Sequence, residues 1–269
     1  MNIVVVCQAR LGSTRLPRKV FLPLAGKPVI ARFMERVTRS RLATTVVVAT
    51  TTDAVDEPLV KECTALGYEV FRGHPTDLLD RHYQVGKHYE ADVVVKIPSD
   101  CPLIDPSIID GVLSVYLANS TDVDFVSNLH PATYPDGNDV EVMTMPILET
   151  AWQRASRAFE REHTTPWFWD GNPDVRCVNV SWPTGADLSM SHRWTLDYPE
   201  DYQFINAVYN ALYPQNPAFS LEDVLSLVRD RPEITALNAH LAGVNWYRNH
   251  LDELQTISVH ETRQAPLEA

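Results

Sequence analysis

Short apolar runs alternate with amphipathic segments along the first half of the chain. The runs are rich in β-branched residues and carry few polar positions, which is typical of strands covered on both faces. They occupy residues 2–7, 44–51, 68–73, 91–97 and 124–129. Apolar residues at helical spacing predict helices between them, over residues 27–40, 58–67 and 106–120. This order predicts an α/β fold with a doubly wound, mostly parallel sheet.

The second half is less regular. Apolar runs predict three more strands, at residues 139–145, 175–182 and 193–197. Residues 151–169 predict a helix that runs into an aromatic loop, and further helices are predicted over 199–213 and 221–238. The polar residues from 256 onward predict a flexible tail.

Composition narrows the classes of protein. With 269 residues, 45% of them hydrophobic, the chain can bury a large core. Its net charge of -12 disfavours a nucleic-acid binder, which needs a basic face for counterion release. The four cysteines form no C-x-x-C pair and predict a reducing compartment. The start MNIVVVCQAR has no basic n-region and too short an apolar core for a signal peptide, and no run reaches the ~20 apolar residues that a membrane span needs. We therefore expect a cytoplasmic protein that binds neither membranes nor nucleic acid.

Positive charge gathers in the opening loop, residues 9–20, directly after the first predicted strand. Ligands collect at this end of the strands in open α/β sheets. The loop matches neither the G-x-G-x-x-G nor the Walker pattern, because Pro17 stands where the latter needs glycine. Small residues around Gly12 let backbone N–H groups approach an anion, while Arg15 and Lys19 supply charge, which favours a triphosphate. A solvated basic loop is the alternative interpretation.

Six blocks of the chain resemble, in order, the cytidylyltransferases related to spore-coat polysaccharide protein F. More distantly, they resemble the CMP-sugar synthetases that activate 3-deoxy-octulosonate and acylneuraminate. The blocks are QARLGSTRLPRKVFLPLAGKPVI (8–30), FRGHPTDLLDRHYQ (71–84), SDCPLIDPSIID (99–110), GNDVEV (137–142), EREHTTPWFW (160–169) and RWTLDYPEDYQFI (193–205). The resemblance implies a Rossmann-like nucleotidyltransferase domain over 1–215, with acceptor and dimer elements around 139–182. A helical extension (216–255) and the tail (256–269) remain outside that domain.

The resemblance also implies ligands and roles. It implies CTP as the donor, Mg²⁺ as the cofactor, a homodimer, and a place in cell-surface polysaccharide biosynthesis. Carried over position by position, it assigns Arg15 and Lys19 to the triphosphate. The nucleotide-binding positions are Ala9, Arg10, Gly12, Ser13 and, in the base-recognition block, Arg81. Two positions depart from the pattern, because Arg18 and Ser99 stand where members often have glycine.

Two aspartates are candidate metal ligands. Asp100 follows the strand predicted over 91–97, and Asp197 ends the one predicted over 193–197, so both should emerge beside the opening loop. Mg²⁺ is typically bound by one or two carboxylates plus phosphates and waters, and the resemblance assigns both residues to the metal. Asp105, which precedes a proline, is interpreted as a turn or helix cap. In the implied reaction an acceptor oxygen attacks the α-phosphorus and pyrophosphate leaves.

The acceptor side is predicted from the resemblance. It points to a small anionic acceptor, such as a sugar acid, a sugar phosphate or another phosphorylated molecule. Its arginines and histidine could grip that anion, and Asp139 could orient hydroxyls. The candidate acceptor residues are Asp139, Glu141, Arg161, His163 and Arg193. The aromatic run at 167–169 could instead be core or interface, and His163 could make a structural hydrogen bond.

Two other functions compete with cytidylyl transfer. A glycosyltransferase would use a D-x-D metal motif, and DVD at 122–124 matches that string, although it precedes a predicted strand instead of ending one. A non-catalytic nucleotide-binding module is the second rival. The presence of Arg15, Lys19 and both candidate metal aspartates disfavours it.

Overall fold

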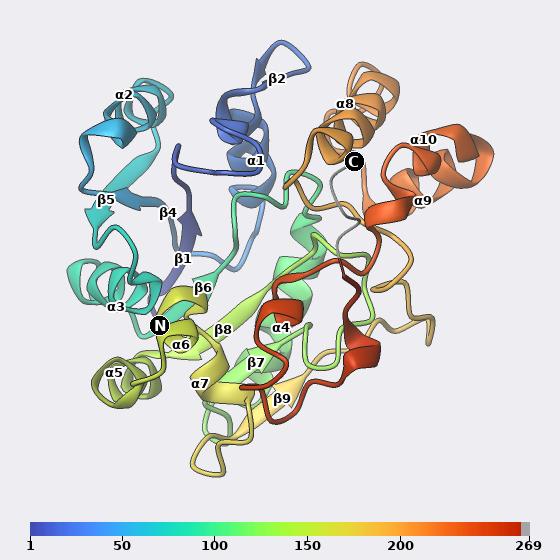
Figure 1. Cartoon of the computed structure of the whole chain (residues 1–269). Helices are drawn as coiled ribbons and strands as arrows, with labels where there is room; N and C mark the ends of the chain where they lie inside the picture. Colours follow the sequence, from blue (N-terminus) through green and yellow to red (C-terminus); the bar gives the residue numbers. More distant parts are fainter. Residues whose placement is uncertain (265–269) are drawn as a thin grey trace.

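The computed structural model describes residues 1–264 and has a seven-stranded sheet at its centre (Figure 1). The strand order is β5-β4-β1-β6-β8-β7-β9. The strands are β1 (Ile3–Gln8), β4 (Thr45–Thr51), β5 (Glu69–Gly73), β6 (Val93–Lys96), β7 (Phe125–Ser127), β8 (Glu141–Thr144) and β9 (Cys177–Asn179). A separate antiparallel pair follows the opening loop, β2 (Pro23–Leu24) and β3 (Lys27–Pro28).

The sheet is mostly parallel. Strand β1 pairs in parallel with β4 and β6, β4 with β5, and β7 with β9. Only β8 runs against its neighbours, β6 and β7. This arrangement confirms the predicted α/β class.

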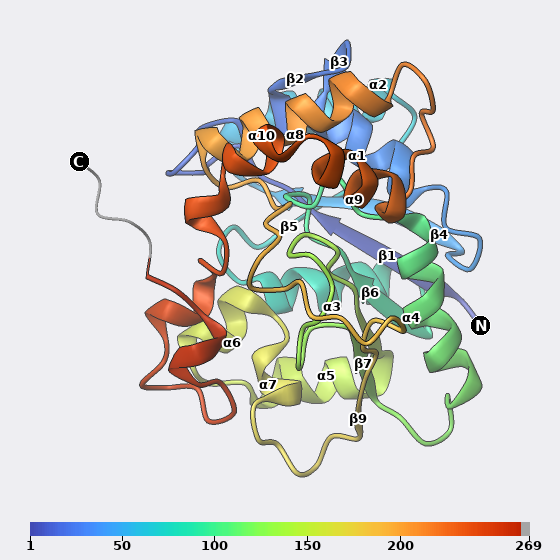
Figure 2. The ribbon, with the colours of Figure 1, turned by 90° about the vertical axis from the view of Figure 1, so that its right-hand side faces the viewer.

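Helices cover both faces of the sheet. The α-helices are α1 (Val29–Val37), α2 (Glu57–Ala65), α3 (Leu78–His88), α4 (Pro106–Ala118), α5 (Met145–Arg154), α6 (Ala158–His163), α7 (Pro166–Trp169), α8 (Pro199–Leu212), α9 (Leu221–Asp230) and α10 (Pro232–Ala236). Short 3₁₀ turns are η1 (Lys19–Phe21), η2 (Ala54–Asp56), η3 (Ala239–Leu241), η4 (Trp246–Asn249) and η5 (Val259–Glu261). Figure 2 places α1, α8 and α9 on one side of β1 and α3 and α5 on the other.

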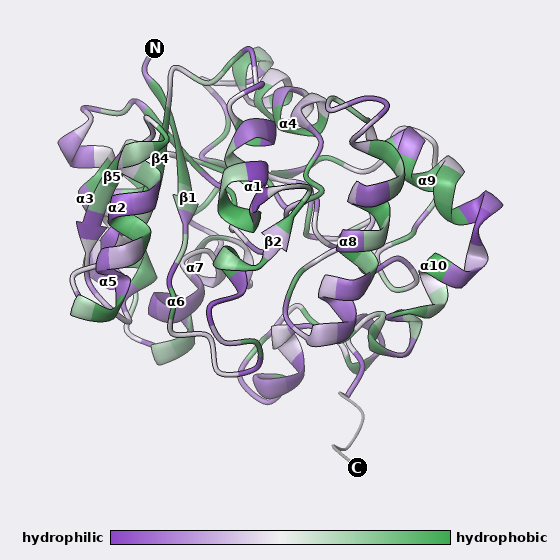
Figure 3. Cartoon of the chain, turned by 90° about the horizontal axis from the view of Figure 1, so that it is seen from above, coloured by the Kyte–Doolittle hydropathy of each residue, from purple (hydrophilic) through white to green (hydrophobic). Residues whose placement is uncertain are grey.

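The uniformly apolar strands follow from this double cover. Val5 and Cys7 pack among α1, α4 and α8, whereas Val4 and Val6 pack among α3, α5 and α7. All four side chains are fully buried, and burying a valine stabilises a fold by roughly 1.5–3 kcal/mol. Figure 3 shows β1 hydrophobic, while helix α2 is partly hydrophilic.

Three segments differ from the prediction. Residues 193–197 form a single bridge from Arg193 to Asp136 and no strand, because their backbone bonds to loops on two sides. The helix predicted over 151–169 is divided into parts of α5, α6 and α7; Thr164, at φ 73°, ends α6 in a conformation that helices exclude. The helix predicted over 221–238 breaks at Arg231, because the following proline disfavours helical geometry there.

The end of the described chain packs against the body. Helices α9 and α10 bury Val224, Val228 and Ile234 in the same core as β1. The backbone N–H groups of Gln255 and Thr256 donate to Asp170 Oδ1 at 2.8 and 2.9 Å. The start of the predicted tail, at Thr256, therefore contacts the body; the flexible-tail prediction stays a prediction, and its remainder, 265–269, lies outside the described residues. Within residues 1–264, no helix combines the length and the apolar character that crossing a membrane requires.

Candidate active site

The opening loop leaves β1 at the sheet edge where a ligand was predicted. The Ala9 N–H continues the sheet bonding by donating to Ala49 O at 3.1 Å. The buried carboxylate of Asp56 then accepts from Leu11 N at 2.7 Å and from the Thr51 hydroxyl. This anchor fixes the start of the loop, beyond which Arg10 and Gly12 are exposed.

Both candidate metal aspartates meet the cations of the opening loop. Lys19 Nζ lies 3.2 Å from Asp100 Oδ2 and 2.9 Å from Asp197 Oδ1, and it donates to Leu196 O at 2.7 Å. Arg15 Nη2 lies 2.8 Å from Asp197 Oδ1. Segments that are distant in the sequence thus place two carboxylates and two cations within direct contact.

The charges in this group support one another. Burial alone would raise the pKa of Asp197, but Lys19 and Arg15 outweigh it and hold that pKa far below its usual range. Burial likewise opposes the charge of Lys19, yet Asp100 and Asp197 raise its pKa above the ordinary value. Asp197 is therefore a carboxylate and Lys19 an ammonium at neutral pH.

A cavity of about 430 Å³ opens beside this ion cluster. Arg15, Asp100 and Asp197 line one part of it. Four of the predicted acceptor residues also line it: Asp139, Glu141, His163 and Arg193. The structure thus brings half of the predicted site residues around one cavity.

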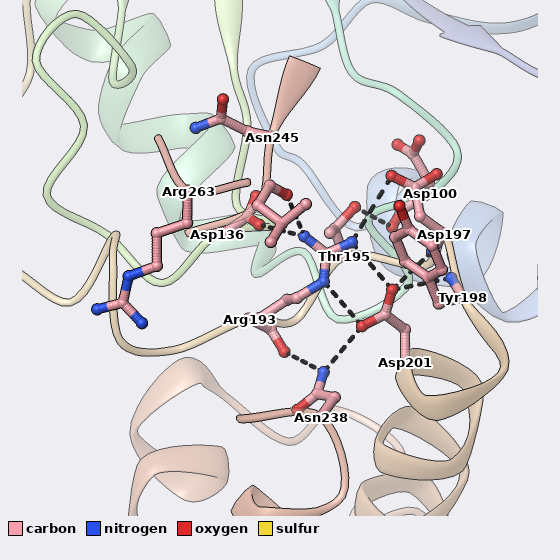
Figure 4. A network of polar contacts seen from close by, with 12 residues as sticks. Asp100, Asp136, Arg193, Thr195, Asp197, Tyr198, Asp201, Asn238, Asn245 and Arg263 are labelled. Atoms are coloured by element: carbon pink, nitrogen blue, oxygen red, sulfur yellow. Dashed lines mark hydrogen bonds and ion pairs between the residues drawn. The ribbon is translucent and has the colours of Figure 1, made fainter. Parts of the chain in front are cut away.

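Arg193 lines the cavity but is held by the protein itself. Its side chain is 1% exposed, and its Nε and Nη2 donate to the Asp201 carboxylate at 2.8 and 3.0 Å. The remaining Nη1 donates to Val244 O and lies 3.5 Å from Asp136 Oδ2 (Figure 4). These contacts raise the pKa of Arg193 further against the effect of burial. Its guanidinium is an internal anchor in this geometry.

A second ion pair lies across the cavity. Lys96, at the end of β6, pairs with the buried Glu141 on β8, and His130 Nε2 is 3.8 Å from the same carboxylate. Burial would raise the pKa of Glu141, but Lys96 and then His130 lower it to about 2. Asp139 lacks such a partner, and burial together with Asp100 and Glu141 raises its pKa to about 7.

Half of the predicted site residues lie outside the cavity lining, namely Ala9, Arg10, Gly12, Ser13, Lys19, Arg81 and Arg161. Arg161 pairs with Asp77 and donates from Nη1 to Trp152 O at 2.9 Å, so it joins α6 to the start of α3. Arg81 is buried and donates from Nε to His74 O at 3.0 Å. Nε and Nη1 of Arg161, and Nε and Nη2 of Arg81, therefore bond within the protein, and the roles expected for the two residues at the acceptor and the base stay predictions.

The loop and turn predictions have mixed outcomes. Asp105 Oδ1 accepts from Ser107 N at 2.8 Å and caps α4, as predicted. Ser13 Oγ accepts from Leu16 N at 3.4 Å and so stabilises the opening loop.

In the DVD string, Asp124 pairs with Arg176 at 2.7 Å, and the string is not part of the cavity lining. This geometry gives the glycosyltransferase alternative no metal site at DVD.

Several cavity residues were missed by the sequence analysis. They come from β6, the turn around Asp136 and the end of the chain: Lys96, His130, Asp136, Trp246, Tyr247, Arg248 and Glu261. The only sequence signal was local, since Trp246 and Tyr247 are large aromatic residues in an otherwise polar stretch.

Comparison with known families decides the class of this site. A family model described as cytidylyltransferase matches residues 4–219. The chain belongs to the cytidylyltransferase family. Members of a family share a fold and a reaction class, so this cytidylyltransferase is an enzyme that transfers a nucleotidyl group.

Similar proteins agree with this assignment. An uncharacterized protein of Methanocaldococcus jannaschii is 32% identical over 241 residues, which cover 90% of this chain and 96% of that protein. The spore coat polysaccharide biosynthesis protein SpsF of Bacillus subtilis is 27% identical, over 86% of this chain and 96% of its own. The 3-deoxy-manno-octulosonate cytidylyltransferase of Geobacter sulfurreducens is 35% identical over 44% of this chain and 47% of its own. The resemblance to the spore-coat and CMP-sugar synthetase group is confirmed.

Solved structures extend the comparison to the fold. A cytidylyltransferase from Leptospira borgpetersenii matches with a TM-score of 0.82 at 31% identity, over 87% of this chain and 97% of that one. A CMP:2-keto-3-deoxy-manno-octonic acid synthetase complexed with CTP matches with a TM-score of 0.58 at 19% identity, over 78% and 99%. The second likeness concerns the fold alone, and it confirms the nucleotidyltransferase type of sheet.

Proposed function

We propose that this enzyme transfers CMP from CTP to a small anionic acceptor, a sugar acid or a sugar phosphate, and releases pyrophosphate. The observation that carries the proposal is the convergence of Asp100 and Asp197 on Lys19 and Arg15 at the end of β1. A triphosphate needs several cations, and a phosphate-bridging metal needs carboxylate ligands. Arg15 and Lys19 supply the cations and the two aspartates supply the carboxylates, with the paired atoms at most 3.2 Å apart.

We also propose Mg²⁺ as the cofactor, held by Asp100 and Asp197. The donor set fits this ion, because each carboxylate has an oxygen within 3.2 Å of the same ammonium group and hard cations prefer oxygen ligands. When bound, Mg²⁺ would offset negative charge that develops on the phosphoryl oxygens. The homodimer and the place in polysaccharide biosynthesis stay predictions.

In the proposed reaction, an acceptor oxygen attacks the α-phosphorus in line. The new bond joins that oxygen to phosphorus, the bond from the α-phosphorus to the bridging oxygen breaks, and pyrophosphate leaves with its electron pair. Arg15 and Lys19 are the groups that stabilise the charge on the triphosphate and the leaving pyrophosphate. An acceptor oxygen that is already ionised needs no proton acceptor from the protein.

A pyrophosphate-release screen tests the proposal. Sugar acids and sugar phosphates are offered with each of the four ribonucleoside triphosphates and Mg²⁺. We expect release with CTP and an anionic acceptor, and a CMP-linked product by mass spectrometry. Release of a nucleoside diphosphate from a nucleotide-sugar, or no pyrophosphate with any combination, would refute cytidylyl transfer.

A further inference from the structure

The last part of the described chain forms one side of the cavity. We call residues 243–261 the C-terminal wall, because Trp246, Arg248 and Glu261 from this segment line the cavity. The wall lies beyond residue 219, where the family match ends. It is therefore a part of this chain's site that family membership does not describe.

The C-terminal wall is anchored to the rest of the site. Arg193 donates to Val244 O and also pairs with Asp201, whose Oδ2 accepts from Asp197 N at 2.9 Å (Figure 4). The wall's far end is held by Asp170 Oδ1, which accepts from Thr256 N at 2.9 Å. One buried arginine thus connects the wall to the backbone of a candidate metal ligand.

The aromatic part of the wall is uncharged. The ring of Trp246 stacks on His163 with a centroid separation of 3.9 Å, and Tyr247 packs edge-on against Trp246. Burial lowers the pKa of His163 to about 3, and it raises the pKa of Tyr247 well above its ordinary value. These rings present flat, neutral surface at neutral pH.

The cations that line the cavity differ in their partners. Arg15 pairs with Asp197, Lys96 with Glu141, and Arg193 with Asp201, so each is neutralised by the protein. Arg248 is the exception: among residues 1–264, no carboxylate lies within ion-pair distance of its guanidinium. Its Nη1 donates to Asn245 O, which leaves further N–H donors for a ligand.

We propose that Arg248 binds the anionic group of the acceptor, a carboxylate or a phosphate, and that the Trp246 ring covers the uncharged part beside it. This inference rests on the proposed function. A guanidinium can bind either anion through two parallel hydrogen bonds. A cation in the cavity that has no carboxylate partner can bind such an anion without first breaking an ion pair. The predicted alternatives, Arg161 and Arg193, are engaged elsewhere.

The test compares Arg248→Gln with Arg229→Gln. Arg229 is an exposed arginine on α9 outside the cavity lining, so its variant makes the same chemical change without touching the site. With the best acceptor from the pyrophosphate screen, we expect Arg248→Gln to raise the acceptor KM at least tenfold. The KM for CTP should stay within twofold of the unchanged enzyme, because Arg15 and Lys19 remain.

Matched acceptors identify the anion. Each active acceptor is compared with an analogue in which its carboxylate or its phosphate is replaced by a hydroxyl. For the analogue that lacks the group bound by Arg248, the unchanged enzyme and the Arg248→Gln variant should have the same KM. Arg248→Lys keeps the charge without the planar fork, and we expect a smaller rise in KM. This variant also serves as the test if the glutamine variant does not fold, which a thermal midpoint checks.

The outcomes separate the two proposals. Equal acceptor KM values for the Arg248 and Arg229 variants, with pyrophosphate still released, overturn the Arg248 assignment and leave cytidylyl transfer in place. A preference for uncharged acceptors overturns the Arg248 assignment and the anionic acceptor of the proposed function, while cytidylyl transfer itself stands. No release from CTP with any acceptor overturns the proposed function, and the Arg248 assignment fails with it.

Discussion

The two parts of the cavity are assembled in different ways. The part beside the opening loop takes Arg15 and Asp100 from the segments that follow the parallel strands β1 and β6, and the ion pairs there remain partly exposed. The part beside the C-terminal wall takes Glu141 from the antiparallel strand and Trp246 from near the end of the chain. Its central ion pair is almost completely buried.

This difference separates the chemistry at the nucleotide, which enzymes of this fold share, from the chemistry at the acceptor, which differs from one enzyme to another. Strand ends of a parallel sheet meet at one edge in every member of such a fold, so charges placed there serve the common nucleotide. The acceptor part depends on contacts between distant segments, and it can change with the end of the chain while the sheet stays the same. We therefore expect variants in the first part to affect transfer to every acceptor, and variants in the second to affect the choice of acceptor or the stability of the fold.

The largest expected effect lies in the nucleotide part. Asp100→Asn and Lys19→Ala should each lower turnover by about 100-fold or more, since each removes a group that stabilises developing charge. The loss should be the same for all acceptors. Steady-state pyrophosphate release measures it, with Asp122→Asn, a change in the DVD string outside the cavity, as the control. Near-normal activity in both variants would contradict the proposed role of this cluster.

The buried pair on the acceptor side predicts a pH effect on stability. The pKa of Glu141 is about 2 in the fold and about 4.3 in an unfolded chain, so the pair stabilises the fold above pH ~5. That contribution, on the order of 3 kcal/mol, is lost as the pH falls through 4 towards 2. Urea denaturation at pH 7, 4 and 3 should show this loss, and Glu141→Gln should remove it. The exposed Glu222 on α9 provides the control, because Glu222→Gln should keep the full pH dependence.

The fold could be predicted because its signals are local. Runs such as residues 3–7 and 46–49 are apolar at every position, which is typical of strands between two layers. The prediction was wrong where tertiary contacts decide. Residues 193–197 are apolar enough for a strand, but Asp136 and Asp100 supply their backbone partners from loops.

The residues of the candidate site also divide into those that the local sequence could place and those that only tertiary contacts place. Asp100 could be placed because it follows the apolar run of β6, which ends at the sheet edge. Asp197 reaches the same place although its own segment forms no strand, so the resemblance placed it better than the apolar pattern did. Arg161 and Arg193 could not be placed, since an arginine in a motif carries no sign of the carboxylate that will bind it in the fold. Arg248 was missed for the opposite reason: it belongs to no motif, and only the path of the chain brings it to the cavity.

A backbone change at the base of the acceptor part should lower stability by about 2 kcal/mol. Gly137 has φ +105°, and a Cβ there would lie 2.7 Å from the Trp194 carbonyl carbon and 2.8 Å from Thr195 N. Gly137→Ala therefore forces apart the segments that carry Asp136 and Arg193. Urea denaturation compares it with Gly111→Ala in α4, where the new methyl meets nothing within 4 Å and should stabilise the helix by up to ~1 kcal/mol. Equal stability of the two variants would refute the close packing.

The smallest effect is expected at Arg18, directly beside Lys19. Arg18 has φ 56°, a left-handed conformation that glycine adopts at lower cost, and its guanidinium lies 5.4 Å from the Phe21 ring. Arg18→Gly removes about 1 kcal/mol of backbone strain, but it also loses the ring contact and makes the unfolded chain more flexible. These terms nearly cancel, so unfolding free energy should change by less than about 1 kcal/mol. Because Arg18 forms no ion pair with Asp100 or Asp197, whereas Lys19 pairs with both, turnover should stay within about threefold, against the 100-fold loss expected for its neighbour. A loss as large as that of Lys19→Ala would extend the triphosphate site to Arg18 and make the whole opening loop, rather than its two paired cations, the nucleotide part of the cavity.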